Sequence, residues 1–292
     1  MAFRVEIDPN SGFCFGVINA IDKAEQFLKT QNKLFSLGDI VHNNGEVNRL
    51  ADLGLNSISS NEYSNLSNTN VLFRAHGEPP ASYLQAVKEG LKVIDATCPV
   101  VLKLQQRVKK AYHELKQING QLVIFGKVGH PEVIGLQGQI EDNATLINHP
   151  NDISTIDPLR PVELFSQTTM SIDGFNLLIQ NIKQHLSPNT SFVWHDTICR
   201  QVAGRVPKVA EFAKRVSVLI FVGGVKSSNA KVLYNECLKV NTKSYFISSV
   251  NEIKQEWFTP DVTIVGITGA TSTPRWQLDE VADFSNQFNH SS

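Results

Sequence analysis

The sequence predicts an α/β protein built from three related units, each with a mainly parallel sheet. Two observations lead to this fold class. Runs typical of buried strands alternate along the chain with runs whose apolar residues recur every three or four positions, which is the pattern of parallel βαβ units. The same succession of elements also recurs three times, at intervals of about a hundred residues.

Each unit opens with a turn that carries one cysteine and leads into a helix. The three turns are residues 12–16, 95–99 and 196–200, and the expected helices span residues 17–28, 100–115 and 202–216. Pro99 supports the second helix, because proline is favoured at the first helical position. The cysteines of the three turns therefore lie at helix N-termini, where unpaired N–H groups and the helix dipole favour negative charge.

Two strand-like runs follow in each unit, and each run ends in a polar loop. The first runs are residues 34–42, 122–130 and 218–229, and the second runs are residues 71–77, 162–169 and 262–272. A helical segment lies between the two runs of a unit. Parallel strands with helical crossovers therefore account for the whole repeat.

The ends and boundaries of the units follow from this pattern. Residues 1–8 read as an N-terminal strand, and residues 56–70, rich in Ser and Asn, are expected to form a surface loop with a short helix. We place the three units at residues 14–97, 98–196 and 197–284, joined by the N-terminal strand at 1–13.

The three turn cysteines indicate a metal centre. A lone cysteine is more often a small buried hydrophobe, and Cys237, inside a helical stretch, fits that description. Cys14, Cys98 and Cys199 are too far apart for a zinc knuckle or a ferredoxin-type run, so their site forms only when the whole chain folds. Three thiolates without a fourth suit a cubane iron–sulfur cluster with one open iron, where chemistry can occur.

The polar loops supply a set of donors that suits an anion such as a diphosphate. In parallel sheets ligands bind beyond the carboxyl ends of the strands, where these loops lie. Histidine, hydroxyl and amide groups can all donate hydrogen bonds to an anion. Taken singly, a histidine is as easily a structural residue, and Ser227 with Ser228 can be a helix N-cap pair. The set is His42, His76, His130, Ser227, Ser228, Asn229 and Ser272.

Glu132 differs from this set because it is an acid in loops otherwise made of donors. It lies two residues after His130, in the sequence GHPE. An acidic group in such a place indicates a proton carrier. The alternative is an exposed loop carboxylate with no role.

Composition and charge exclude several classes of protein. The net charge of the 292 residues is −1, so we expect no general attraction to nucleic acid or to an anionic membrane. The longest apolar run is too short to span a membrane, and the first residues lack the apolar core of a signal peptide. Four cysteines in this context indicate a reducing cytoplasm, where metal binding or catalysis is more common than disulfides.

Nine ordered motifs make the chain resemble one family closely, the 4-hydroxy-3-methylbut-2-enyl diphosphate reductases, which catalyse the last step of the methylerythritol phosphate route to isoprenoids. The motifs run from residue 12 to residue 274, almost the whole chain. They are GFCFG (12–16), VHN (41–43), AHG (75–77), DATCP (95–99), GHPE (129–132), QTT (167–169), DTIC (196–199), SSN (227–229) and STP (272–274).

The resemblance implies a trefoil of three α/β units around one central 4Fe–4S cluster, with Cys14, Cys98 and Cys199 as its ligands. It makes the histidine, serine and asparagine set the diphosphate pocket. It also assigns the proton donor to Glu132, which with Thr168 orders the substrate hydroxyl. The implied reaction is a two-electron, two-proton reductive dehydroxylation to isopentenyl and dimethylallyl diphosphates, with an external ferredoxin or flavodoxin as electron donor.

The chain departs from common family patterns at Lys127, at residues 204–206 and at residues 269–271, none of which is a proposed ligand. Two other classes of protein share part of this pattern. A 4Fe–4S lyase of the quinolinate-synthase type also uses three cysteines, but it would favour arginines in the pocket. A non-catalytic zinc site or redox sensor is the other class, and a sensor that binds DNA should show a basic patch.

No Gly-x-Gly-x-x-Gly follows a strand, which argues against a bound nicotinamide or flavin.

Overall fold

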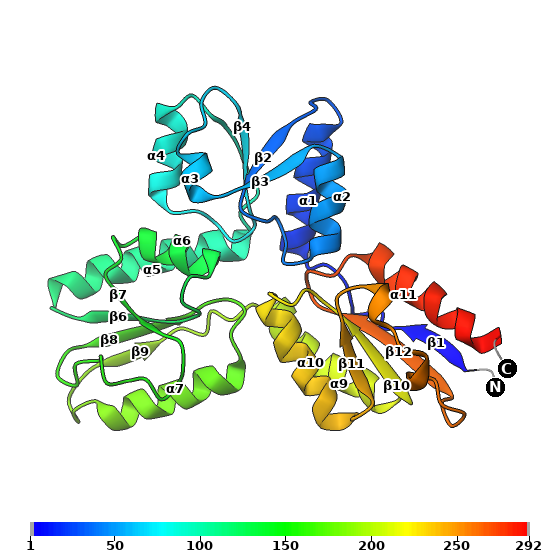
Figure 1. The fold of residues 1–292 in the computed structure, drawn as a ribbon. Coiled ribbons are helices and arrows are strands. Elements are labelled where there is room, and N and C mark those ends of the chain that lie inside the picture. Colours follow the sequence, from blue (N-terminus) through cyan, green and yellow to red (C-terminus); the bar gives the residue numbers. More distant parts are fainter. Residues whose placement is uncertain (1–2, 291–292) are drawn as a thin grey trace. The chain divides into compact units, whose positions relative to one another are not determined.

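The computed structural model describes residues 3–290, with the side chains of Ser228 and His290 outside the description. The chain divides into two compact units. Figure 1 labels their helices and strands. The first unit contains the chain up to residue 18, residues 39–55, and the chain from residue 200 onward. The second contains residues 19–38 and 56–199. Within residues 3–290, no helix is long and apolar enough to cross a membrane.

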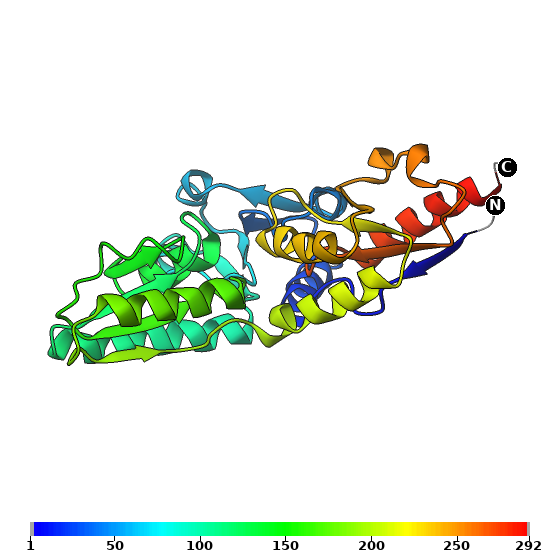
Figure 2. The same ribbon diagram turned by 90° about the horizontal axis from the view of Figure 1, so that it is seen from below.

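The first unit holds one parallel sheet between two layers of helices (Figures 1 and 2). Leu219 and Phe221 pack on one layer, whereas the alternating Ile220 and Val222 pack on the other. The strands are β1 (Arg4–Ile7), β10 (Val218–Val222), β11 (Ser244–Ile247) and β12 (Ile264–Gly269). The first layer contains α9 (Arg205–Lys214) and α10 (Ser228–Val240), and the second contains α11 (Arg275–Gln287).

Shorter elements complete the first unit. They are α2 (Asn44–Asp52), α8 (Arg200–Ala203), and the 3₁₀ turns η1 (Val250–Glu252), η2 (Gln255–Trp257) and η3 (Phe288–His290).

The second unit holds two sheets. The first has helices α1 (Phe15–Leu28), α3 (Ser60–Tyr63) and α4 (Pro80–Lys88), the first of which begins in the other unit. Its core includes Val71 and Phe73. Its strands are β2 (Leu34–Leu37), β3 (Leu55–Ile58), β4 (Asn70–Phe73) and β5 (Lys92–Asp95).

The other sheet of the second unit has helices on both faces. Leu122 and Ile124 pack against α5 (Pro99–Gln117) and α6 (Pro131–Gly138), whereas Phe125 stacks on Phe175 of α7 (Ile172–His185). Its strands are β6 (Gln121–Phe125), β7 (Ala144–Ile147), β8 (Val162–Ser166) and β9 (Phe192–Trp194).

All three sheets have the same strand order, which confirms the predicted α/β class with three related, mainly parallel units. The orders are β3-β2-β4-β5, β7-β6-β8-β9 and β11-β10-β12-β1. In each, the second strand of the repeat comes first, followed by the first, third and fourth. The N-terminal strand β1 takes the fourth place in the third sheet, where it pairs in parallel with β12. The boundaries of the three predicted units stay a prediction.

Two local predictions need correction. The single helix expected over residues 202–216 is two helices, α8 and α9, separated by Gly204. Pro207 explains the break, because its ring would clash with the carbonyl of Ala203 and its nitrogen has no hydrogen to donate. The loop expected from residue 56 begins with the strand β3, although the short helix predicted there is present as α3.

Candidate functional site

Each of the three turn cysteines is half-buried at the start of a helix, and its backbone N–H donates to a loop that follows the third strand of a sheet. The bonds run from Cys14 to the Thr271 carbonyl (3.2 Å), from Cys98 to that of Ala75 (3.1 Å) and from Cys199 to that of Thr168 (2.8 Å). These loops follow β12, β4 and β8, which hold the same place in their sheets. The repeat therefore extends to the way in which each thiol is anchored.

Cys237 lies in a different environment. It is fully buried in α10, within the apolar cluster that also contains Leu233 and Phe221. Burial raises the pKa of its thiol to about 12, so the group stays protonated and uncharged. This fits the prediction that Cys237 is a core residue.

The structure brings Glu132 and Thr168 together, as predicted. The backbone N–H of Thr168 donates to Oε1 of Glu132 at 2.7 Å, and the Thr168 hydroxyl lies 2.7 Å from Oε2. Glu132 belongs to the first turn of α6, which Pro131 opens and His130 caps by accepting the Glu132 N–H at its Nδ1. The acid is thus fixed by a helix start and by the loop after β8.

The environment of Glu132 favours the neutral acid. Its side chain is 2% exposed, and this burial raises its pKa to about 7, although the two hydrogen bonds from Thr168 act in the opposite direction. In the structure the main cause is removal of the carboxylate from water.

Two of the predicted histidines lie beside each other in the second unit. The rings of His76 and His130 are 5.4 Å apart between centroids and nearly perpendicular, and both are half-buried. His76 precedes Gly77, whose φ of +76° favours glycine. A Cβ at this position would also lie only 2.6 Å from Nε2 of Gln105. Gly77 thus allows the backbone conformation of the loop that carries His76.

In the first unit, the predicted hydroxyl and amide donors gather at the N-terminus of α10. Ser227 is the N-cap, and its hydroxyl accepts the Ala230 N–H at 3.2 Å. The Ser272 hydroxyl lies 3.4 Å from that of Ser227, and the Asn229 amide donates to Thr271 Oγ1 at 2.8 Å. Unpaired N–H groups and hydroxyls at a helix N-terminus favour an anion. The Ser228 side chain lies outside the described part of the chain.

The backbone of His42 packs closely against the loop that precedes α10. A Cβ on Gly224 would overlap the His42 carbonyl oxygen, so only glycine allows the loop after β10 to lie so close to residue 42. Next to it, Asn43 caps α2 and donates its amide to Gln277 Oε1 of α11 at 2.7 Å. The loop carrying His42 is thus held between the loop after β10 and helix α11.

The structure also shows a positive side chain near Cys14 that sequence reasoning missed. Arg205 donates to the carbonyl of Phe13 at 3.4 Å, and its Nη1 is buried without a hydrogen-bond partner among the described residues. Burial lowers the pKa of Arg205, whereas negative charge on Cys14 and Asp8 opposes that change. A half-buried arginine here favours an anionic centre at Cys14. Its place six residues after Cys199 was the available signal.

A second buried acid was also missed. Glu78 is 7% exposed, and burial raises its pKa to about 7, against the effect of the Arg74 guanidinium 3.6 Å away. Its spacing from His76 equals that of Glu132 from His130, and this repeated His-x-Glu pattern could have pointed to it.

The predicted site residues therefore form two groups. The first unit holds Cys14, His42, Ser227, Asn229 and Ser272. The second unit holds Cys98, Cys199, His76, His130, Glu132 and Thr168.

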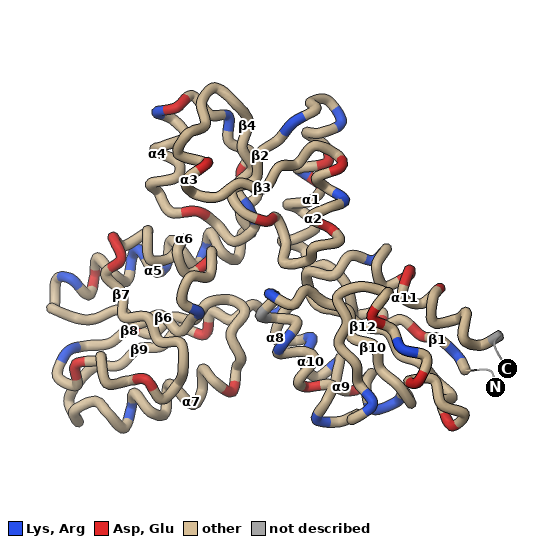
Figure 3. The backbone as a smooth tube through the Cα atoms, viewed as in Figure 1, with Lys and Arg blue, Asp and Glu red and all other residues tan. Residues whose placement is uncertain are grey.

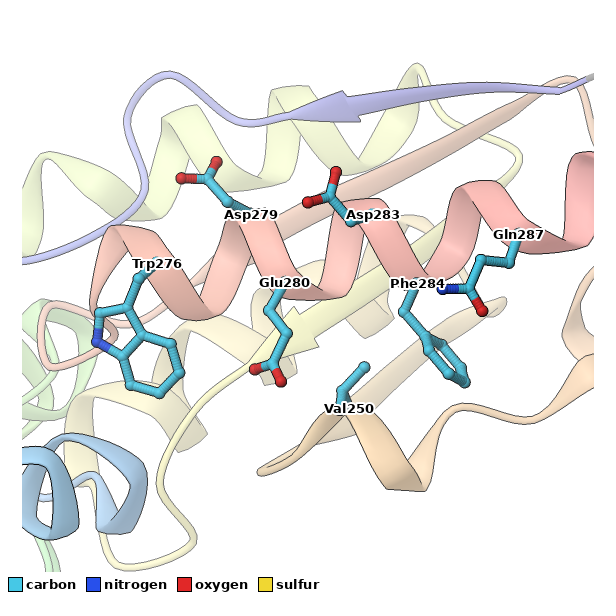
Figure 4. Close-up of a pocket in the computed structure, with 7 residues that line it drawn as sticks. All are labelled: Val250, Trp276, Asp279, Glu280, Asp283, Phe284 and Gln287. Atoms are coloured by element: carbon cyan, nitrogen blue, oxygen red, sulfur yellow. The ribbon is translucent and has the colours of Figure 1, made fainter.

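A groove along α11 of the first unit contains none of these residues. Figure 4 shows its lining, where acidic side chains lie beside aromatic ones. The lining residues are Val250, Trp276, Asp279, Glu280, Asp283, Phe284 and Gln287.

Comparison with known proteins gives a consistent result along the whole chain. A family model described as LytB protein matches residues 5–285. A protein of Porphyromonas gingivalis named 4-hydroxy-3-methylbut-2-enyl diphosphate reductase is 50% identical over 279 residues, which cover 95% of this chain and 96% of the relative. A protein of Bacteroides fragilis with the same name is 47% identical, and the match covers 96% of each chain.

Solved structures agree with the sequence relatives. One is described as (E)-4-hydroxy-3-methyl-but-2-enyl diphosphate reductase, the terminal enzyme of the non-mevalonate pathway. It is 34% identical, with a TM-score of 0.71 over 98% of this chain and 100% of that one. The E-1-hydroxy-2-methyl-but-2-enyl-4-diphosphate reductase of Plasmodium falciparum is 25% identical, with a TM-score of 0.83 over 97% of this chain and 88% of that one.

Proposed function

The chain belongs to the LytB protein family, and from this premise we propose that it reduces 4-hydroxy-3-methylbut-2-enyl diphosphate to isopentenyl and dimethylallyl diphosphates. The reaction removes a hydroxyl group with two electrons and two protons, and it is the last step of the methylerythritol phosphate route. The observation that carries the proposal within the site is the buried Glu132–Thr168 pair, because this reaction needs an acid that is protonated near neutral pH.

Family membership implies an iron–sulfur cofactor, and the donor set fits one. Three half-buried thiols share the same anchoring at helix starts, and Arg205 supplies half-buried positive charge beside Cys14. We propose that Cys14, Cys98 and Cys199 ligate a single 4Fe–4S cluster and that Cys237 does not. When bound, the cluster would pass electrons to the substrate and offer one iron without a protein ligand.

Glu132 is the proposed proton donor of the reaction. At neutral pH a pKa of about 7 leaves much of the group protonated, so a proton on its carboxyl is available. The Thr168 hydroxyl lies 2.7 Å from Oε2 and can accept a hydrogen bond from the protonated carboxyl. Its own hydrogen can then be donated to the substrate hydroxyl. Because both Glu132 and Thr168 are buried, the proton is kept from exchange with bulk water.

The diphosphate is held, in this proposal, by donors from both groups of site residues. Ser227, Ser228, Asn229 and Ser272 offer hydroxyl, amide and backbone donors at the start of α10, where the helix dipole adds attraction. His42, His76 and His130 add charge-assisted hydrogen bonds when protonated. A phosphate group at these side chains would also favour their protonated forms.

The electrons come from outside the chain. We propose an external ferredoxin or flavodoxin as the donor. We also place the reaction in the cytoplasm, where the thiols stay reduced before the cluster is inserted.

The decisive test of function is an anaerobic assay of the reconstituted enzyme with the diphosphate substrate and a reduced dye. Formation of both isoprenoid diphosphates is the expected result. Absence of turnover from protein with a full iron and sulfide content would contradict the proposal.

The test of the cluster ligands compares four Cys→Ser variants after anaerobic reconstitution. We expect Cys14→Ser, Cys98→Ser and Cys199→Ser each to lose the intact cluster and nearly all turnover, because each removes a thiolate ligand. Cys237→Ser is the matched control and should keep the iron content of the wild type. A cluster lost in the Cys237 variant and retained in any of the others would overturn the assignment.

A further inference from the structure

One surface of the first unit stands out by its charge. Among residues 200–215, five basic side chains and one acidic side chain, Glu211, give +4, whereas the whole chain carries −1. The charge lies on α8 and α9, where Figure 3 shows Lys and Arg gathered. The chain's net charge gave no sign of this local concentration. The basic residues are Arg200, Arg205, Lys208, Lys214 and Arg215.

The helix faces decide which of these charges reach solvent. Helix α9 buries Val209 and Phe212 against the sheet, which leaves Lys208 and Lys214 exposed. Arg200 on α8 is exposed as well. Arg215 and Arg205 contribute less, because Arg215 pairs with Glu6 at 3.4 Å and Arg205 is half-buried against the α1 turn.

An exposed apolar pair borders this basic surface. Phe15 and Ile18, in the first turn of α1, are 58% and 44% exposed. The Phe15 N–H donates to Oε1 of Gln201 in α8 at 3.2 Å, and Arg205 donates to the Phe13 carbonyl. These two bonds place the first turn of α1 beside α8 and the first turn of α9, which hold Arg200 and Lys208, and Phe15 directly follows Cys14. Large exposed apolar side chains with a charged border mark interaction sites.

We propose that Phe15, Ile18, Arg200 and Lys208, named here the basic docking surface, bind an acidic one-electron carrier protein. This proposal rests on the proposed function, which requires two electrons from an external donor. Opposite charges would steer the carrier to the surface and hold it in a small, transient complex. Phe15 would form the apolar centre of that contact, next to one of the proposed cluster ligands.

Charge complementarity also distinguishes this surface from the groove on α11. That groove presents Asp279, Glu280 and Asp283, which would repel an acidic carrier. Of the two surfaces, only the basic one combines an attractive charge with a position beside a turn cysteine.

The kinetic test compares two ways of delivering electrons to the reconstituted holoenzyme. One donor is a reduced flavodoxin of strongly negative net charge, and the other is reduced methyl viologen, a small cation that needs no docking surface. For Lys208→Glu we expect kcat/KM for flavodoxin to fall about tenfold at low ionic strength and to approach the wild-type value in high salt. Turnover with methyl viologen should not change.

Lys254→Glu is the matched control, because it makes the same charge change elsewhere on the first unit. Lys254 is 65% exposed and follows Ile253, which packs on the α11 face of the sheet, whereas α9 covers the other face. Flavodoxin-driven turnover of this variant should match the wild type. Equal losses in the Lys208 and Lys254 variants would overturn the proposal.

A binding measurement separates failure of this surface from failure of the proposed function. Titration calorimetry of oxidised flavodoxin into the holoenzyme should show binding that both Lys208→Glu and Phe15→Ala weaken several-fold. Unchanged affinity in both variants, or equally tight binding of a short DNA duplex, would contradict the docking surface. Loss of methyl viologen turnover in the wild type would instead contradict the proposed function and leave the titration to decide about the surface.

Discussion

Two loops of the second unit share the pattern His-x-Glu and still place their acids in different surroundings. In the loop after β6, Glu132 receives two hydrogen bonds from Thr168 at 2.7 Å each. In the loop after β4, Glu78 faces the guanidinium of Arg74 at 3.6 Å. Burial raises the pKa of both acids to about 7.

The comparison separates two properties that are often treated as one. Burial is the main reason that each acid keeps its proton, and both pKa values rise to about 7. The partners differ: Arg74 stabilises a charge on Glu78, whereas the Thr168 hydroxyl offers Glu132 a route by which a proton can leave. A raised pKa alone therefore does not identify the acid that works in the reaction.

The largest expected effect follows from replacing each acid by its amide. Glu132→Gln keeps the shape and the hydrogen bonds but removes the acidic proton, so turnover should fall on the order of a hundredfold or more. Cluster content and substrate affinity should stay near the wild-type values. Steady-state assays with a reduced dye measure this.

Glu78→Gln is the matched control for that experiment. It removes a second buried carboxyl whose pKa is also raised to about 7, and turnover should stay within a few-fold of the wild type. If both variants lost turnover equally, the distinction between the two loops would be wrong. Near-normal turnover in Glu132→Gln would show that the protons come from elsewhere.

A smaller effect is expected from the histidines, which the two loops have in common. We expect His130→Ala, and likewise His42→Ala and Ser227→Ala, to weaken diphosphate binding by roughly 1–3 kcal/mol for each lost charge-assisted bond. His76→Ala should behave as His130→Ala does, since the two rings are adjacent. Calorimetric titration with inorganic diphosphate and with substrate tests this. Unchanged affinity in these variants would remove the diphosphate pocket from the proposal.

The sequence predicted the centre of the fold better than its edges. The six strand runs singled out by composition are β2, β4, β6, β8, β10 and β12, the inner strands of the three sheets. Inner strands are covered on both faces and leave continuous apolar runs. Of the edge strands, only β1 was predicted with its residue bounds. An edge strand such as β9 is short and largely exposed, so its sequence resembles that of a loop.

The same limit applied to the site. Glu132 was found because it belongs to a motif, and its role as an acid followed from chemistry. Glu78 has the same spacing from a histidine, but its surroundings include Asp95 and Gln105, which are distant in sequence. Similarly, the place of Arg205 beside Cys14 depends on a contact with Phe13, which is 192 residues away in the chain. Long-range burial of a charged group leaves no local pattern in a sequence.

The smallest expected effect concerns stability, where the two acids should behave alike. The ordinary carboxyl pKa of 4.5 applies to the unfolded chain, and the folded value of both acids is about 7. Between these pH values the folded protein binds more protons than the unfolded chain. The stability that each acid contributes is therefore fully present below pH 4.5 and is lost as the pH rises to about 7. Each acid adds up to about 1.4 kcal/mol per pH unit to this slope.

An amide cannot titrate, so Glu132→Gln and Glu78→Gln should each flatten the decline of stability between pH 5 and pH 7 by about 1 kcal/mol per unit. Relative to the wild type, both variants should gain stability as the pH rises through this window and show no further gain above it. Calorimetric unfolding of all three proteins in the same cluster state, at several pH values, measures the slopes. Parallel slopes in wild type and Glu132→Gln would mean that Glu132 is ionised at neutral pH, and the acid proposed for the reaction would then lack its proton.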